Sequence, residues 1–181
     1  MIFTETLLRG SYTIELNTLA DDRGWFARTY CKNEFAAIGH TKEWVQLNHS
    51  FTKHKGIIRG MHFQLPPFKE IKLVRCIAGS VYDVIVDLRK DSATFLNFFG
   101  VELSAQNKKM IYIPEGFAHG FQALGENCEL LYHHSEFYTP GAEGGIKYNE
   151  PKININWPMP VTDISERDTQ HPLLDDNYKG I

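Results

Sequence analysis

Two short apolar stretches of the chain carry basic side chains where a strand would ordinarily carry neutral ones. Residues 57–64 contain Arg59 and His62, and residues 71–75 contain Lys72. An imidazole is well suited to take a proton near neutral pH, and nearby cations stabilise negative charge on a reacting oxygen. We therefore predict a proton-transfer site inside a β-structure, weighed against the plainer reading of His62 as a structural residue.

Three further polar side chains, Asp83, His119 and Tyr132, also lie in apolar stretches. Burying charged groups is costly unless they are paired or bind a ligand. Alternation along a strand places Lys72 and Asp83 on inward faces of their strands. For Asp83, both a salt bridge to Lys72 or Arg59 and a direct catalytic role stay open. For Tyr132, composition alone favours a core residue with a hydrogen-bonded hydroxyl.

Arg59 and His62 have opposite parity, so simple alternation places them on different faces of one strand. Gly60 lies between them and could accommodate a β-bulge that turns both side chains toward one site. We therefore expect an irregularity at Gly60.

The elements that must position these residues are mostly strands. About nine to eleven short strands recur at roughly 8–12 residue spacing with turn signals between them, which indicates a single sandwich or barrel. One tight turn is expected at residues 21–24. A short helix is predicted within residues 31–38, closed by Gly39, and residues 165–168 could open another near the end of the chain.

Composition agrees with one globular domain, since the chain has 181 residues, 43% hydrophobic and 23% charged. The formal net charge of −3 argues against a general nucleic-acid binder. The first ten residues lack a signal pattern, and no window approaches the ~18 apolar residues of a membrane span, so a cytoplasmic protein is expected. Cys31, Cys76 and Cys128 are scattered and are expected to be reduced thiols.

Taken together, these stretches resemble the dTDP-4-dehydrorhamnose 3,5-epimerase family almost from end to end. The motifs that carry the resemblance are Asp22-Arg23-Gly24-Trp25-Phe26, Asn48-His49-Ser50, Arg59-Gly60-Met61-His62-Phe63-Gln64, Lys72-Leu73-Val74-Arg75, Asp83-Val84-Ile85-Val86-Asp87-Leu88-Arg89, Ile113-Pro114-Glu115-Gly116-Phe117-Ala118-His119-Gly120-Phe121 and Ile164-Ser165-Glu166-Arg167-Asp168.

The resemblance implies an all-β, cupin-type jelly-roll β-barrel with a few short peripheral helices. It implies one epimerase domain over residues 1–181, with residues 162–181 as a short helical or loop extension. A homodimer that needs no metal and no cofactor is expected. The implied substrate is a nucleotide 4-keto-6-deoxyhexose, with dTDP as the expected nucleotide, inverted at C3, C5 or both in deoxysugar biosynthesis of the dTDP-L-rhamnose type.

The resemblance also assigns roles to individual residues. The family's base falls on His62, oriented by Asp168, and its general acid falls on Tyr132. Two more positions, Arg59 and Lys72, match groups that hold the substrate and the enolate oxygen, as does His119. The remaining substrate-binding positions are placed at Arg23, Phe26, Gln46, Asn48, Asp83, Glu143 and Arg167, with Tyr138 stacking on the nucleotide base.

Three positions depart from the family pattern. Leu47 stands where an aspartate is common, Arg28 stands where many members have an acidic residue, and Gly144 stands where some members have an arginine. The proton-transfer set is intact, so the reaction type is better determined than the substrate. These departures could retune the choice of nucleotide or limit epimerisation to one carbon of another nucleotide-activated keto sugar.

Two other function classes compete with an epimerase. A metal-dependent cupin enzyme would use His62, Gln64, Glu70 and His119 as ligands, although Lys72 and Arg59 would repel a divalent ion. A catalytically silent sugar-binding module is the other. Binding alone does not require both His62 and Tyr132, so their presence speaks against such a module.

Overall fold

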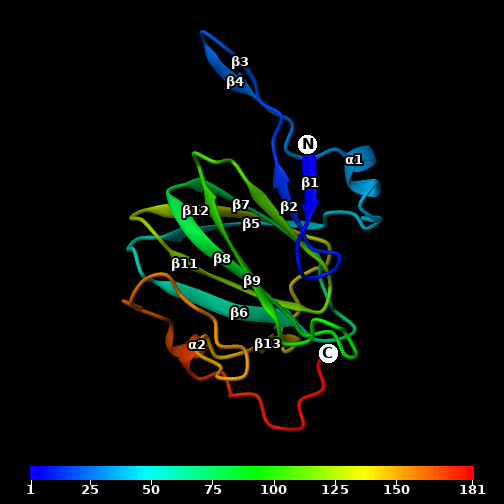
Figure 1. Ribbon diagram of the computed structural model, residues 1–181, viewed down its shortest axis with the longest axis vertical. Helices are drawn as coiled ribbons and strands as arrows, with labels where there is room; N and C mark the ends of the chain where they lie inside the picture. Colours follow the sequence, from blue (N-terminus) through cyan, green and yellow to red (C-terminus); the bar gives the residue numbers. More distant parts are fainter.

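Runs of β-branched and aromatic residues fold into two facing antiparallel sheets in the computed structural model, which describes residues 1–181 (Figure 1). The larger sheet consists, in order across it, of β1 (Ile2–Glu5), β2 (Tyr12–Glu15), β10 (Met110–Ile113), β7 (Lys72–Ala78), β12 (Cys128–His134) and β5 (Gln46–Thr52). The smaller sheet consists of β13 (Glu143–Gly145), β6 (Ile58–Gln64), β11 (Phe117–Ala123), β8 (Ser80–Asp87) and β9 (Phe98–Ser104).

From β5 to β8 each successive strand changes sheet, and β10 to β13 alternate in the same way. Crossing back and forth between two antiparallel sheets is typical of a jelly roll. The predicted fold class, an all-β cupin-type jelly roll with short peripheral helices, is confirmed.

A separate hairpin projects from one end of the molecule, at the top of Figure 1. It consists of β3 (Leu19–Asp21) and β4 (Gly24–Phe26). The tight turn expected here is confirmed, because the Asp21 carboxylate accepts a hydrogen bond from the backbone N–H of Arg23 at 2.9 Å. The hairpin pairs with neither sheet.

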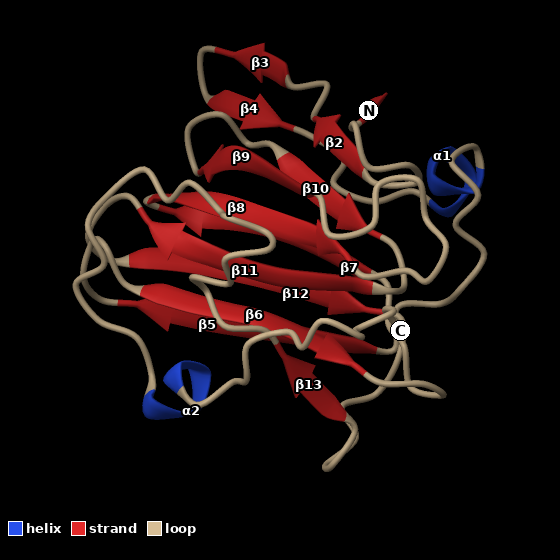
Figure 2. Cartoon of the chain, turned by 60° about the horizontal axis from the view of Figure 1, so that its bottom comes forward, coloured by secondary structure: helices blue, strands red, loops and turns tan.

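Two short helices lie outside the sheets, α1 (Lys32–Ala36) and α2 (Glu166–Thr169) (Figure 2). Both were expected from the sequence. The Ser165 hydroxyl caps α2 by accepting the backbone N–H of Asp168 at 3.1 Å. Neither helix has the length or apolar character needed to cross a membrane.

The main core lies between the two sheets. Its buried side chains come from both sheets, with Val74 and Cys76 on β7 facing Val81 and Ile85 on β8. The inward faces predicted for β7 and β8 are therefore confirmed. A second apolar cluster covers the outer face of the smaller sheet with the C-terminal part of the chain, and a third packs Phe35 of α1 against the larger sheet.

The structure has thirteen strands, more than the nine to eleven expected. The two that the sequence did not suggest, β1 and β13, lie at the edges of the sheets. β13 contains two consecutive glycines, which carry no strand signal, so only pairing with β6 reveals it.

The irregularity expected at Gly60 is present. His62 pairs with His119 and Arg59 with Phe121, so three steps along β6 match two along β11. Gly60 has φ +131°, and a Cβ there would lie 2.5 Å from the Cα of Gly120. Only glycine fits this close approach between the two strands. The bulge brings both Arg59 and His62 to the same cavity.

Candidate active site

A cavity of about 300 Å³ opens between the two sheets. Strands β6 and β11 form one wall, and β5, β7 and β12 form the other. Ten of the predicted site residues line it, namely Gln46, Asn48, Arg59, His62, Lys72, His119, Tyr132, Tyr138, Glu143 and Arg167. Glu70, His134 and Ser50 also line it.

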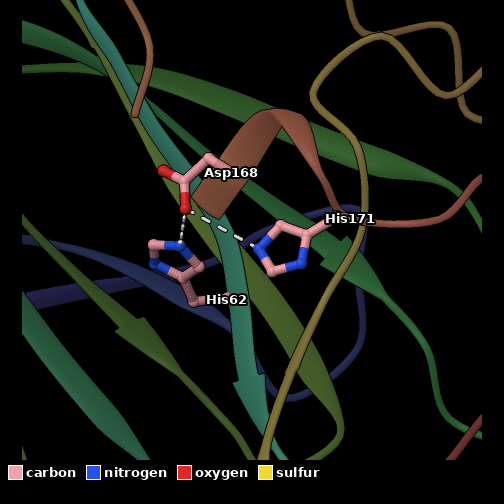
Figure 3. A group of neighbouring side chains, drawn as sticks. All are labelled: His62, Asp168 and His171. Atoms are coloured by element: carbon pink, nitrogen blue, oxygen red, sulfur yellow. Dashed lines mark hydrogen bonds and ion pairs between the residues drawn. The ribbon is translucent and has the colours of Figure 1, made fainter. Parts of the chain in front are cut away.

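His62 is oriented by a buried carboxylate, as Figure 3 shows. Its Nε2 lies 2.7 Å from Oδ1 of Asp168, and the other carboxylate oxygen accepts the backbone N–H of Gly60 at 3.1 Å. Burial alone would raise the pKa of Asp168, but the hydrogen bonds from His62 and Gly60 outweigh it and hold that pKa below its usual value. The carboxylate is therefore ionised at neutral pH, and His62, with 36% of its side chain exposed, keeps Nδ1 free for the cavity.

A second imidazole lies behind the same carboxylate. His171 Nε2 is 3.7 Å from Asp168 Oδ1, and no hydrogen-bond partner reaches this nitrogen (Figure 3). Burial lowers the pKa of His171, and the neighbouring His62 lowers it further. His171 therefore packs as a neutral ring against the His62–Asp168 pair.

His119 is held by Asp83 from the neighbouring strand. Both Asp83 oxygens lie within hydrogen-bond distance of His119 Nε2, at 3.0 and 2.9 Å. Asp83 is completely buried and does not line the cavity, so it orients His119 instead of facing the substrate space. Burial raises the pKa of Asp83, and the charge of His119 opposes this rise. Of the two alternatives open for Asp83, the salt bridge to Lys72 or Arg59 is not formed, since the carboxylate pairs with His119.

Tyr132 faces the cavity from β12, on the wall opposite His62. Its hydroxyl lies 3.1 Å from the Ser50 hydroxyl, and its ring meets the ring of His119 edge-on with centroids 6.2 Å apart. Burial raises the pKa of Tyr132, so the phenol holds its proton at neutral pH. A protonated phenol beside a substrate can act as an acid.

Lys72 is buried at the base of the cavity beside Glu70. Its Nζ is 3.1 Å from Oε1 of Glu70, whose Oε2 accepts a hydrogen bond from Nδ1 of His134 at 2.6 Å. Arg59, by contrast, is exposed, and its guanidinium donates to the carbonyl of Phe51 at 2.9 Å. Two cations thus reach the cavity from different walls, one buried and one exposed.

The mouth of the cavity holds the residues matched to nucleotide contacts. Arg167 donates to Glu143 at 2.6 Å, and the Tyr138 hydroxyl donates to the same carboxylate at 3.0 Å. The Gln46 side chain accepts the backbone N–H of Tyr138 at 3.1 Å and donates to Asn48 at 3.2 Å. These contacts place the exposed Tyr138 ring beside the opening.

Besides Asp83, two predicted substrate-binding residues do not line this cavity. Arg23 and Phe26 are on the β3–β4 hairpin, where Arg23 pairs with Asp21 and Phe26 is 68% exposed. Neither lines the cavity of its own chain.

The three departures from the family pattern also avoid the cavity. The Leu47 side chain is exposed on the face of β5 opposite Gln46 and Asn48, and Arg28 pairs with Glu34 at 3.2 Å. Gly144 lies against the Phe63 ring, so a side chain there would collide with that ring. Within one chain, none of the three lines the cavity.

The four residues considered as metal ligands, His62, Gln64, Glu70 and His119, are not gathered around one point. Glu70 is engaged by Lys72 and His134, His119 by Asp83, and the Gln64 amide donates to the backbone carbonyls of Phe68 and Phe137. The cluster of ligand-type atoms that does lie close together contains His62, Asp168 and His171.

His134 and His171 were not predicted from the sequence, and Glu70 was predicted only as a possible metal ligand. The sequence does contain a pattern that points to Glu70 and His134. Glu70 lies two positions before Lys72 and His134 lies two positions after Tyr132, so alternation along a strand places each pair on one face. His171 follows a helix and carries no such signal.

The chain matches the family model for dTDP-4-dehydrorhamnose 3,5-epimerase over residues 5–176. It belongs to this family. A dTDP-4-dehydrorhamnose 3,5-epimerase of Salmonella typhimurium is 44% identical over 177 residues, which are 97% of this chain and 96% of that relative. The crystal structure of the Elizabethkingia anophelis epimerase is 38% identical, covers 98% of both chains and superposes with a TM-score of 0.93.

A further epimerase of this family was solved with a ligand. The dTDP-6-deoxy-D-glucose-3,5-epimerase of Legionella pneumophila, in complex with dTDP-4-keto-L-rhamnose, is 35% identical with a TM-score of 0.89, covering 95% of this chain and 92% of that one. The predicted family is confirmed, and the chain is an isomerase of the epimerase class.

Proposed function

We propose that this chain inverts C3 and C5 of a dTDP-activated 4-keto-6-deoxyhexose, the carbons on either side of the ketone, in dTDP-L-rhamnose biosynthesis. Membership of the dTDP-4-dehydrorhamnose 3,5-epimerase family supports the reaction, and the keto-sugar ligand of the Legionella relative supports the substrate class.

The observation that carries the mechanism is the placement of His62 and Tyr132 on opposite walls of one cavity. Inversion requires a proton to leave one face of a carbon and another to arrive at the opposite face. A base and an acid on the same wall would return the proton to the face it left.

In this mechanism His62 accepts the proton through Nδ1, because Nε2 is engaged by Asp168. The ionised Asp168 stabilises the imidazolium that forms. Negative charge then develops on the ketone oxygen, where Lys72, His119 and Arg59 supply positive charge and hydrogen-bond donors. Tyr132 protonates the enolate from the other side.

The nucleotide is proposed to bind at the mouth of the cavity, with the base on the Tyr138 ring. Arg167, Gln46 and Asn48 offer hydrogen-bond donors for the pyrophosphate and sugar, and Glu143 holds Arg167 in place. The exposed aromatic ring beside a cation suits a flat base followed by phosphates.

We test the proposal by incubating the protein with dTDP-4-keto-6-deoxyglucose in heavy water and following C3 and C5 by NMR. The wild-type chain should exchange and invert both carbons; exchange at one carbon alone would indicate a mono-epimerase, and none would indicate a binding module. His62→Ala should lose exchange on the order of 100–1000-fold or more, the scale of one catalytic group.

Tyr132→Phe separates the two proton-transfer steps. The base remains, so the enolate still forms and takes deuterium back from the His62 side. Exchange should therefore persist while inversion falls by roughly 100-fold or more. Near-normal turnover in His62→Ala would sink the assignment of the base, and unchanged inversion in Tyr132→Phe would sink that of the acid.

We further propose that residues 1–181 form one epimerase domain that works as a homodimer. The extension at residues 162–181 belongs to the site, since Asp168 within it reaches His62. Arg23 and Phe26 are proposed to enter the cavity of a second copy, because the hairpin carrying them projects from its own chain. Exposed apolar side chains on that hairpin, Leu19, Trp25 and Phe26, support such an association.

A further inference from the structure

A buried carboxylate, Glu70, joins two basic side chains of the cavity. Its Oε1 is 3.1 Å from Lys72 Nζ, and its Oε2 is 2.6 Å from His134 Nδ1. All three side chains are nearly buried, with 10–11% of each exposed. Buried ionic groups are maintained only where their partners satisfy them, so this arrangement is tightly specified.

His134 continues a chain of hydrogen bonds toward the nucleotide end of the cavity. Its Nε2 lies 3.2 Å from the amide nitrogen of Asn48, and the Asn48 oxygen accepts from Gln46. Gln46 in turn accepts the backbone N–H of Tyr138. This series of hydrogen bonds therefore connects the backbone of Tyr138, whose ring is proposed to stack on the base, with Lys72, which is proposed to meet the enolate.

The direction of every hydrogen bond in this series follows from the bond between the backbone N–H of Tyr138 and Gln46. A backbone N–H can only donate, so the Gln46 oxygen faces Tyr138 and its amide nitrogen faces Asn48. The Asn48 oxygen is then occupied, and its amide nitrogen donates to Nε2 of His134. His134 must therefore carry its proton on Nδ1, where it donates to Glu70.

We propose that Glu70 and His134 are positioning residues, which fix the Lys72 ammonium for the enolate oxygen and link it to the nucleotide-binding residues Gln46 and Tyr138. This inference rests on the proposed epimerase function. Neither residue takes or gives a proton to the sugar; both act through Lys72. Binding of the nucleotide would order Tyr138 and Gln46 at one end of this hydrogen-bond series, and thereby Lys72 at the other end.

The charge on Glu70 is central to this role. Burial alone would raise the pKa of Glu70, but the hydrogen bond from His134 and the charge of Lys72 outweigh it and lower that pKa. The side chain is therefore a carboxylate that offers an acceptor oxygen to each of two donors. An amide in the same place has a single acceptor oxygen.

This difference gives a sharp test with Glu70→Gln. The amide must turn its NH2 group toward either Lys72 or the Nδ1–H of His134, so two donors face each other. We expect kcat to fall about 10–100-fold, the range for a hydrogen bond to a charged group, with KM changed less than about threefold. Adding His134→Ala removes one donor and frees the single oxygen of the introduced amide for Lys72.

The double variant Glu70→Gln/His134→Ala should therefore be more active than Glu70→Gln alone, by about fivefold or more. Glu126→Gln is the matched control, because Glu126 forms an exposed pair with His54 at 3.0 Å away from the cavity. The control should keep wild-type kcat. Wild-type kcat in Glu70→Gln, or a double variant at least as impaired as the single one, overturns the inference.

Ring-nitrogen NMR of histidine decides the inference independently of turnover. The spectrum should show His134 as the Nδ1–H tautomer in the wild type, and this signal should shift in Glu70→Gln and stay unchanged in Glu126→Gln. An Nε2–H tautomer in the wild type overturns the inference even if the chain is an active epimerase. Failure of wild-type exchange at C3 and C5 would instead count against the proposed function.

Discussion

At the scale of single residues, the cavity is built from three imidazole–carboxylate pairs. His62 is paired with Asp168, His119 with Asp83, and His134 with Glu70. Each carboxylate engages one ring nitrogen and so leaves only the other for the cavity or for a neighbour. Nε2 is engaged in His62 and His119, whereas Nδ1 is engaged in His134, so the three imidazoles present different nitrogens and can have different roles.

Asp168→Asn tests the first of these pairs. The amide keeps the shape but cannot stabilise the imidazolium of His62, so we expect kcat to fall about 10–100-fold. Steady-state kinetics with the keto sugar measure this loss. A variant with unchanged kcat would contradict the orienting role of Asp168.

The difference in stability between Asp168→Asn and the wild type should depend on pH. The pKa of Asp168 is lowered in the folded chain, so its contribution to stability is present above the unfolded pKa of about 4 and is lost as pH falls through the folded pKa. The melting temperature of Asp168→Asn should therefore lie below that of the wild type at pH 7, and the gap should close below about pH 4. Melting curves across pH measure it; a gap that widens in acid would contradict the sign.

The sequence predicted most cavity residues and the pairing of His62 with Asp168, but not the pairs formed by His119 and His134. Lys72, His119 and Tyr132 stood out as polar groups in apolar strands, and they do line the cavity. For Asp83, the sequence left a salt bridge to Lys72 or Arg59 and a direct catalytic role open, whereas its partner is His119. Such pairings depend on the register between β8 and β11, which alternation along one strand does not encode.

At the scale of elements, the bulge between β6 and β11 is the feature that assembles the site. Without it, Arg59 and His62 would point to opposite faces of the smaller sheet. The bulge was predictable because Gly60 separates two polar residues of opposite parity. The edge strand β13 was not predictable, since it pairs with β6, which lies far from it in sequence. The edge strand β1 pairs locally with β2, and its four residues were too short a run to stand out.

Gly60→Ala tests the bulge. The new methyl group would meet the Cα of Gly120 at 2.5 Å and the carbonyl oxygen of His119 at 3.0 Å, on a backbone with positive φ. We expect a loss of unfolding free energy of roughly 1–3 kcal/mol together with reduced activity, because His62 must shift. Urea unfolding and turnover measure both effects.

Gly125→Ala is the matched control for this substitution. A Cβ there meets only the Ser80 hydroxyl oxygen, at 3.9 Å. Its unfolding free energy should change by about 0.5 kcal/mol or less. Equal effects of the two substitutions would show that the close approach at Gly60 has no special importance.

At the scale of the whole molecule, two residues predicted for the site lie outside the cavity of their own chain. Arg23 and Phe26 match positions expected to contact substrate, yet they project on the β3–β4 hairpin and miss the cavity of their own chain. The sequence alone does not say whether they belong to the cavity of their own chain or to that of a second copy. Outward-facing Leu47 and Phe51 on the edge strand β5 leave further apolar surface for a second chain.

Exchange of hairpins between two copies can be tested by mixing two inactive variants. In a mixed dimer of His62→Ala with Arg23→Ala/Phe26→Ala, the chain with intact His62 receives an intact hairpin from its partner. Random reassociation makes half of the dimers mixed, each with one complete site of two, so about a quarter of wild-type activity should return. Sedimentation and differently tagged chains verify that mixed dimers form. If they form without any recovery, or if the wild type sediments as a monomer, the hairpin does not serve a second copy.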